Sequence, residues 1–258
     1  YGESTFSISL GETASNIRVS DYTDNTIFIG TGSGKLFKVS NANDSSPSST
    51  EITGSSFPAG YISSIEIGTS DAQLLVTFSN YGVSSVWETM DGGSSWSEKE
   101  GDLPDMPVRW ALYNPINRNE VILATEIGIW HTTDFNSSTP TWLASVDGLA
   151  NVRIDMLQIR QSDGFIVAAT HGRGLFSSTM FQGGTCTATE VANSDQSATG
   201  SVTGTTGAVV SVTCDAGYSG GGNWTCGTDG TFTGTVCSSN SCTATEVANS
   251  DKSTTGLV

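Results

Sequence analysis

Basic residues are scarce in this chain: 10 Lys and Arg stand against 26 Asp and Glu among 258 residues, which gives a formal net charge of -16. A negative field of this size repels phosphate backbones and anionic lipid headgroups. We therefore expect no nucleic-acid partner. No uncharged apolar run approaches the roughly 18 residues that span a bilayer. We also expect no membrane insertion within these residues.

Sustained helical periodicity is missing as well. Charged residues make up only 14% of the chain, whereas Gly, Ser and Thr are abundant, which favours short strands joined by turns. The two histidines, His131 and His171, fall in different predicted repeats. A histidine-based metal site and a Ser-His-Asp triad are therefore poorly supported, and we expect no metal or cofactor.

A pattern recurs four times between Thr31 and Phe176. In each copy a β-rich run ends in Thr, passes through a short Gly-containing loop and resumes with an aromatic residue. The recurring threonines lie at spacings of 46, 48 and 45 residues and are Thr31, Thr77, Thr125 and Thr170. This period, with about four short strands per repeat, is typical of β-propeller blades. We predict an all-β fold that contains a partial propeller of about four blades.

Each repeat also offers an earlier strand that would line the propeller axis, at 16–20, 64–68, 109–113 and 154–159. Turn-forming residues follow each of these strands. The last repeat is expected to stop after its third strand, near Met180. The chain opens at Tyr1 without an initiator Met or a signal segment, and it stops inside a later repeat. We therefore expect both ends to be truncated.

The composition changes at Gly183 to Gly, Thr, Ser and Cys, with no Arg beyond that point. The stretch from Cys186 to Gly200 recurs 56 residues later with two substitutions. We expect propeller blades at 1–182, a small module at 183–240, and at 241–258 the beginning of a second, truncated copy of that module.

All five cysteines lie after residue 185, and four of them frame the small module: Cys186, Cys214, Cys226 and Cys237. Four cysteines permit three pairings. A module of this size buries too little surface to be stable alone, and two bridges would each contribute on the order of 3 kcal/mol. Oxidising surroundings, extracellular or at the cell surface, follow from this cysteine usage. Cys242 belongs to the truncated copy.

The segment from Thr89 to Trp96 contains a hydroxyl residue, Asp91, Gly93 and Trp96 at spacings of two, two and three. It resembles the Asp box of BNR-repeat propellers, a group that includes sialidases, xyloglucanases, sortilin-type receptors and photosystem assembly factors. In such a turn the carboxylate accepts backbone N–H groups, Gly takes a positive φ and Trp packs on the blade. We expect Thr89, Asp91, Gly93 and Trp96 to have this structural role in a turn and no role in catalysis. Asp134 and Trp142 resemble a lengthened copy without the Gly.

The module around the cysteines resembles a sushi, or complement-control, module. The residues that carry this resemblance are Cys214-Asp-Ala-Gly-Tyr218, Thr225-Cys226, Asp229-Gly-Thr-Phe232 and Cys237. The resemblance implies first-to-third and second-to-fourth pairing, that is, Cys186 with Cys226 and Cys214 with Cys237. Phe232 stands where the family usually has Trp, and the Pro common before the last Cys is missing; Trp224 is the candidate to fill the core.

Charged residues are predicted to gather at one end of the propeller channel. Arg109 and Arg153, 44 residues apart, are interpreted as equivalent positions at the start of neighbouring inner strands. Loops that join second and third strands open on the same face, where Glu126, His171 and Arg173 would converge with Asp155. Such a set would suit an anionic or polyhydroxy ligand. The alternative is a set of inter-blade salt bridges.

We expect a non-catalytic recognition or adhesion protein of the cell exterior, with an unidentified glycan or protein as ligand and sushi-like repeats as spacers. No acid and nucleophile pair can be assigned from these residues. The alternative is a glycoside hydrolase, sialidase- or xyloglucanase-like, whose catalytic residues lie partly in missing blades; a purely structural surface component is a third possibility.

Three Asn-X-Ser/Thr triplets, at Asn43, Asn136 and Asn223, fall in predicted loops. They are glycosylation candidates if the source is eukaryotic.

Overall fold

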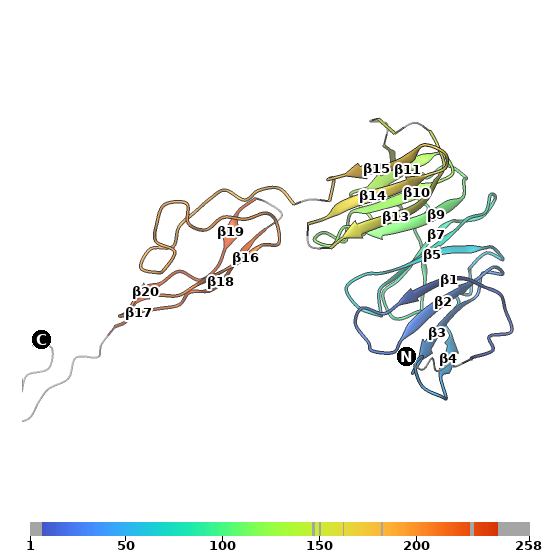
Figure 1. Ribbon diagram of the computed structural model, residues 1–258, viewed down its shortest axis with the longest axis horizontal. Coiled ribbons are helices and arrows are strands. Elements are labelled where there is room, and N and C mark those ends of the chain that lie inside the picture. Colours follow the sequence, from blue (N-terminus) through green and yellow to red (C-terminus); the bar gives the residue numbers. More distant parts are fainter. Residues whose placement is uncertain are drawn as a thin grey trace, which may run out of the picture. The chain divides into compact units, whose positions relative to one another are not determined.

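The computed structural model describes residues 7–145, 148–149, 151–161, 163–181, 183–227 and 230–241 (Figure 1). The chain divides into two compact units, Tyr1–Phe181 and Gln182–Val258. This division lies one residue from the boundary expected from composition. The expected second copy of the module, with Cys242, lies outside the described residues. No helix in the described part of the chain is long and apolar enough to cross a bilayer.

The first unit consists of antiparallel sheets whose strands follow one another in chain order. Blade 1 contains β1 (Ala14–Val19), β2 (Ile27–Thr31), β3 (Leu36–Ser40) and β4 (Ser48–Glu51). Blade 2 contains β5 (Ile62–Ile67), β6 (Leu74–Phe78), β7 (Val86–Thr89) and β8 (Ser97–Glu98). Blade 3 contains β9 (Val108–Tyr113), β10 (Val121–Thr125), β11 (Gly128–Thr132) and β12 (Leu143–Ala144). Blade 4 contains β13 (Ile154–Arg160), β14 (Phe165–Thr170) and β15 (Gly174–Ser178).

These sheets are propeller blades, which confirms the predicted all-β fold and partial propeller. The inner strands β1, β5, β9 and β13 of successive blades lie side by side (Figure 1). Within the described residues blade 4 has three strands, as expected from the sequence.

The recurring threonine closes a tight hairpin between the second and third strands. The Thr31 hydroxyl donates to the Lys35 carbonyl at 3.1 Å, and Thr125 and Thr170 donate to Gly128 and Gly174 at 2.8 Å. Blade 2 differs: Phe78, and not Thr77, takes this position, because the Phe78 N–H bonds the Ser85 carbonyl across a longer loop. A threonine hydroxyl cannot span that loop. Our alignment of Thr77 with the other threonines is therefore wrong by one residue.

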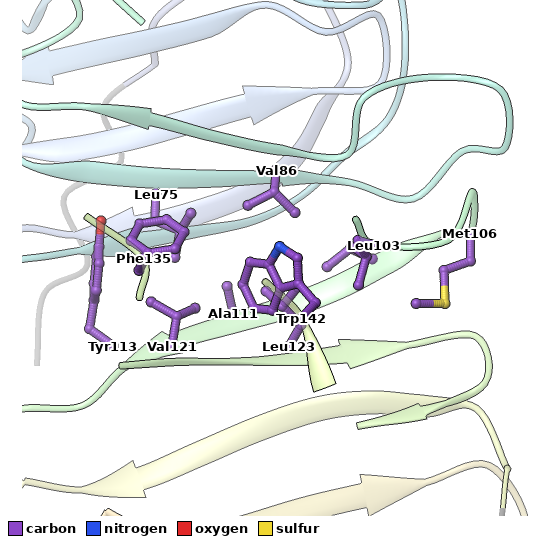
Figure 2. Close-up of a cluster of buried hydrophobic side chains, with 11 residues drawn as sticks. Leu75, Val86, Leu103, Met106, Ala111, Tyr113, Val121, Leu123, Phe135 and Trp142 are labelled. Atoms are coloured by element: carbon purple, nitrogen blue, oxygen red, sulfur yellow. The ribbon is translucent and has the colours of Figure 1, made fainter. Parts of the chain in front are cut away.

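Apolar side chains of facing blades form three buried clusters, one between each pair of neighbours. Figure 2 shows the cluster between blades 2 and 3, where Leu75 and Val86 of one sheet meet Tyr113 and Leu123 of the next. Trp142 is only 3% exposed at the centre of this cluster. Burying one such side chain contributes about 1.5–3 kcal/mol, so each blade stabilises its neighbours.

Every inner strand carries a β-bulge near its start, which inserts one extra residue opposite the second strand. The extra residues are Ser15, Ser63, Arg109 and Asp155. The Ser15 and Ser63 hydroxyls donate to the Ile62 and Val108 carbonyls of the following blade, at 2.7 and 2.6 Å. In blades 1 and 2 the bulge thus turns a serine toward the next blade.

The second unit has short strands: β16 (Val209–Val212), β17 (Tyr218–Ser219), β18 (Gly222–Cys226), β19 (Phe232–Thr233) and β20 (Ser238–Ser239). Disulfides join Cys186 to Cys226 and Cys214 to Cys237, the crossed pairing that the sushi resemblance implies. Trp224 and Phe232 pack on the disulfides in a small buried cluster. The Trp224 indole N–H donates to the Thr235 carbonyl at 3.1 Å, so its polar atom is satisfied.

Candidate ligand-binding sites on the inner strands

The first predicted arginine, Arg109, is the bulge residue of β9. Its Nε donates to Glu126 Oε2 at 3.0 Å and its guanidinium Nη2 to the same oxygen at 2.5 Å. Glu126 follows β10, so this pair lies within blade 3. Both side chains are more than one quarter exposed. An ion pair of this exposure contributes about 1 kcal/mol or less.

The second arginine, Arg153, lies just before β13 and meets Asp155 and His171. Arg153 Nε donates to Asp155 Oδ1 at 2.7 Å, and Arg153 Nη2 lies 2.6 Å from His171 Nδ1. The same His171 nitrogen lies 3.3 Å from Asp155 Oδ2. Partial burial tends to raise the pKa of Asp155, but hydrogen bonds from Arg153 and His171 outweigh it and lower that pKa. Asp155 is therefore a carboxylate at neutral pH.

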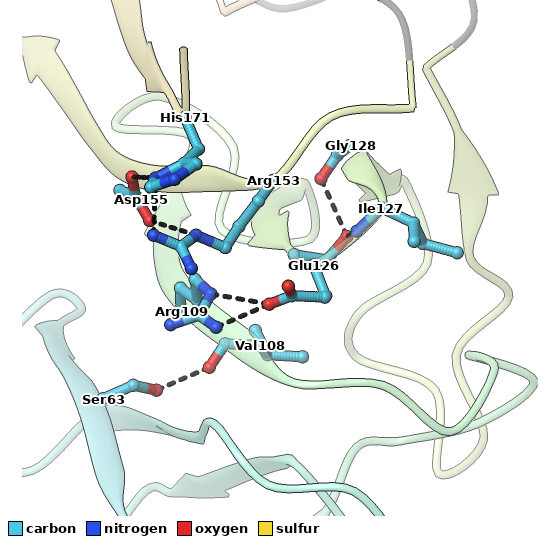
Figure 3. Close-up of polar contacts among 10 residues, drawn as sticks. Ser63, Val108, Arg109, Glu126, Ile127, Gly128, Arg153, Asp155 and His171 are labelled. Carbon is cyan, nitrogen blue, oxygen red and sulfur yellow. Dashed lines mark hydrogen bonds and ion pairs between the residues drawn. The ribbon is translucent and has the colours of Figure 1, made fainter.

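Five of the six predicted ligand-binding residues thus form two ion-paired groups at the start of neighbouring inner strands (Figure 3). The sixth, Arg173, lies in the hairpin after β14, where it is exposed and its side chain makes no hydrogen bond or ion pair within the described residues. The prediction that Arg109 and Arg153 are equivalent is wrong. The bulges make Arg109 equivalent to Asp155, so Arg153 matches Pro107.

Chemically, this end of the inner strands offers guanidinium and imidazole nitrogens to a ligand. The carboxylates of Glu126 and Asp155 are already engaged by arginines within their own blades. The ion pairs lie within blades 3 and 4 and do not join them, unlike the inter-blade salt bridges that were the alternative interpretation. Within the described residues no cluster of three or more His, Cys, Asp or Glu could hold a metal ion.

The turn at Asp91 is built around that carboxylate. Asp91 Oδ1 accepts the Ser95 backbone N–H at 2.8 Å and the Thr89 hydroxyl at 2.8 Å, while Oδ2 accepts the Ser95 hydroxyl at 2.6 Å. These hydrogen bonds, led by the Ser95 hydroxyl, lower the pKa of Asp91 to about 2. Gly93 has a φ of 94°, which favours glycine. Three of the roughly four acceptor positions of this carboxylate are therefore occupied by its own turn.

The turn at Asp134 repeats this geometry across a longer loop. Asp134 Oδ1 accepts the Thr132 hydroxyl at 2.6 Å and the Thr141 N–H at 2.9 Å. In both turns the tryptophan ties its blade to the preceding one. The Trp96 indole donates to the Ile52 carbonyl and the Trp142 indole to the Lys99 carbonyl, each at 3.1 Å.

A cavity that the sequence analysis missed lies toward the C-terminal ends of the same inner strands. Its volume is about 400 Å³. Arg18 of β1, Glu66 of β5, Trp110 of β9 and Gln158 of β13 line it, together with Arg118 from the turn after β9. These residues do not recur from one blade to the next, because each blade supplies a different side chain. The repeat pattern therefore carried no signal for this cavity.

No protein-family model and no curated protein matches this chain. Solved structures of low identity do resemble it. The GH74 xyloglucanase from Xanthomonas campestris is 14% identical, with a TM-score of 0.47 over 63% of this chain and 28% of that one. YCF48 bound to D1 peptide is 19% identical, with a TM-score of 0.47 over 68% and 53%. The Cps50 (Swd1) β-propeller domain of Myceliophteria thermophila is 12% identical, with a TM-score of 0.48 over 83% and 65%. The chain spans less than two thirds of each of these.

The three glycosylation candidates are all exposed. Asn43 and Asn136 lie in turns, as expected. Asn223 does not: it lies on β18, where it pairs with Ser211. The Asn223 side chain is exposed there, although β18 is the central strand of its sheet.

Proposed function

We propose that this chain is a non-catalytic recognition or adhesion protein of the cell exterior. In this proposal the start of β9 and β13 binds an extracellular glycan or protein, and the disulfide-bonded module acts as a spacer. The observation that carries the proposal is the engagement of Glu126 and Asp155 by Arg109 and Arg153. Each carboxylate is held by an arginine of its own blade, which favours its charged form, whereas the arginines keep outward N–H groups for a ligand.

The finer family assignment is part of the same proposal. The two aspartate turns, each with a tryptophan that bonds the preceding blade, support an Asp-box propeller. The crossed disulfides and the buried Phe232 and Trp224 support a sushi-like module. Two disulfides in a small module also support an extracellular or cell-surface location, because such bonds persist in oxidising compartments.

Binding is tested on an array of neutral and acidic oligosaccharides with the labelled full chain. On the acidic oligosaccharides the double variant Arg109→Gln with Arg153→Gln should lose at least about tenfold in signal, since two charge-assisted donors are removed. Arg160→Gln is the matched control, because Arg160 is an ion-paired arginine at the other end of β13. Equal binding by the double variant and the control would contradict a glycan site at this end.

Hydrolysis is tested separately on a sialoside and on a soluble β-glucan. We expect no turnover. Measurable turnover that disappears in Glu126→Gln or Asp155→Asn would favour the glycoside hydrolase over the binding protein. Loss of turnover in only one of the two variants would still assign a catalytic role to that carboxylate.

A further inference from the structure

Glu66 of β5 is a buried carboxylate that the fold leaves without hydrogen bonds. Its exposed fraction is 3%, and within the described residues its side chain accepts no hydrogen bond. The closest cation is Arg18, whose Nη2 lies 3.7 Å from Glu66 Oε2. An ionisable group buried with so few partners is costly to keep. Its oxygens are not among the fully enclosed polar atoms, so they open onto the cavity, where a ligand can bond them.

Glu88 provides an internal comparison, because it is buried to a similar degree at 6% exposed. Its carboxylate accepts the Tyr113 hydroxyl at 2.9 Å and the Gln73 amide at 3.1 Å, and Lys99 Nζ lies 3.5 Å away. The same propeller therefore satisfies one buried glutamate completely. The unsatisfied state of Glu66 is a property of the cavity that it lines, and not of buried glutamates in this fold.

Arg118 faces the same cavity with unused donors. It makes no hydrogen bond or ion pair to any described residue, and its Nε is buried. Its guanidinium carbon lies 5.6 Å from the centroid of the Tyr113 ring, and its charge also interacts with Glu66. The Nε of Arg18 is likewise buried without a partner. These two Nε atoms are enclosed, so a ligand would bond the terminal N–H groups of the arginines that line the cavity.

The remaining walls supply an aromatic ring and amides. Trp110 of β9 is half-buried, and its indole N–H has no hydrogen-bond partner within the described residues. Gln158 and Gln161 add exposed carboxamides, which can both donate and accept. Tyr22 closes one side, where its hydroxyl donates to the Gly68 carbonyl at 2.7 Å. The cavity is thus built from side chains held by four blades.

Charge decides which ligand fits. Arg18 and Arg118 are balanced in the cavity by Asp21 and Glu66, and Arg18 also bonds Asp21 at 3.0 Å. The chain as a whole carries -16 and repels anions at a distance. A neutral ligand rich in hydroxyl groups leaves this balance intact, since hydroxyls both donate to Glu66 and accept from Arg118.

We propose that this cavity binds a neutral hexose residue of an oligosaccharide, with Glu66 and Arg118 bonding its hydroxyls and Trp110 packing on its ring. Its volume of about 400 Å³ falls in the range of roughly 300–1,000 Å³ typical of small-ligand sites. This site is separate from the arginine groups at the start of β9 and β13. It does not depend on the function proposed for them.

The proposal is tested by titrating the full chain with methyl glycosides of glucose, galactose and mannose and with cellobiose and lactose. Binding is followed by calorimetry and by ligand-observed NMR, with methyl glucuronide as the anionic comparator. We expect at least one neutral sugar to bind more tightly than the glucuronide. Arg118→Gln and Gln158→Ala should each weaken that binding about tenfold, because each removes hydrogen bonds to the ligand.

Glu66→Gln keeps the size of the side chain and is expected to weaken binding while the Tm is retained or raised. The double variant Arg109→Gln with Arg153→Gln should leave binding of the small sugars unchanged, which separates this site from the proposed one. Three results would overturn the proposal: no neutral sugar binds at millimolar concentration, the glucuronide binds more tightly, or Arg118→Gln and Gln158→Ala bind like the wild type. The comparison with Arg118→Gln and Gln158→Ala requires that the Tm of each variant shows it to be folded.

Discussion

The two units of this chain are both made of β-strands but are held together in different ways. In the propeller unit three buried clusters lie between successive blades, and no described cysteine takes part. In the second unit the strands have only two to five residues, and the single buried cluster includes the four paired cysteines. Repetition lets each blade bury the face of its neighbour. A lone small module has no such neighbour and depends on covalent links.

Reduction of the disulfides should give the largest effect and separate the two units. Loops of 40 and 23 residues are closed by the bonds, so we expect each bond to contribute roughly 3–4 kcal/mol to the second unit. Under reducing conditions residues 183–241 should become sensitive to protease while the propeller's far-ultraviolet circular dichroism persists. Unfolding of both units at the same reductant concentration would show that their stabilities are coupled.

Trp142→Ala should give the next largest effect, within the propeller. This side chain is 3% exposed at the centre of the cluster between blades 2 and 3, so its removal should cost about 3–5 kcal/mol in the free energy of unfolding, measured in urea. Trp96→Ala is the matched comparison, because Trp96 makes the same indole bond but is only partly buried. A loss for Trp96→Ala as large as that for Trp142→Ala would mean that the bond, and not burial, dominates.

Stability of the propeller should fall as pH rises from about 5 to 8. Burial raises the pKa of Glu66 and of Glu100 to about 7 from an ordinary value of 4.5. Each of these carboxyl groups binds its proton more tightly in the folded than in the unfolded protein. The resulting stabilisation is complete below about pH 4.5 and is lost as pH rises through about 7. For Glu66 this shift corresponds to on the order of 3 kcal/mol. Urea unfolding curves at several pH values should show the decline, and Glu66→Gln should flatten it; equal slopes in both proteins would exclude Glu66 as its source.

Asp91→Ala should give the smallest effect, because Asp91 is exposed and only its turn is affected. We expect the Tm of the propeller to fall by a few degrees and ligand binding to stay unchanged. The pKa of Asp91 is lowered to about 2. The stabilisation of the turn by this carboxylate is therefore present above about pH 4 and is lost as pH falls through about 2. Lost binding at an unchanged Tm would mean that Asp91 contacts the ligand.

The sequence predicted the blades because their pattern has a local cause. Thr31, Thr125 and Thr170 each close a short hairpin with their own hydroxyl, so the same residue recurs wherever the hairpin is short. Where the loop lengthens, Phe78 replaces Thr and packs at 5.3 Å from the Phe57 ring. The register of blade 2 was therefore misjudged. A tertiary aromatic contact had taken the place of the local bond.

The candidate sites were harder to predict because they depend on the bulges. An extra residue in a strand shifts every later side chain to the other face. The bulge residues are two serines, an arginine and an aspartate, so no single residue type marks the bulges in the sequence. The cavity of Glu66 and Arg118 has a further difficulty. It assembles one side chain from each of several blades, and only the three-dimensional order of the blades brings them together.

The crossed disulfides also govern how the second unit would respond to a pulling force. A pull applied between Cys186 and Cys237 passes through the first bond to Cys226 and then along the short segment from Cys226 to Cys237. The bond from Cys214 to Cys237 adds a parallel path through residues 214–226, so only the chain between Cys186 and Cys214 lies outside the loaded segments. Even if all strands of the module separated, the length between Cys186 and Cys237 could grow only by about 3.6 Å for each residue of the segment from Cys226 to Cys237. Under tension the module would therefore act as a nearly inextensible link.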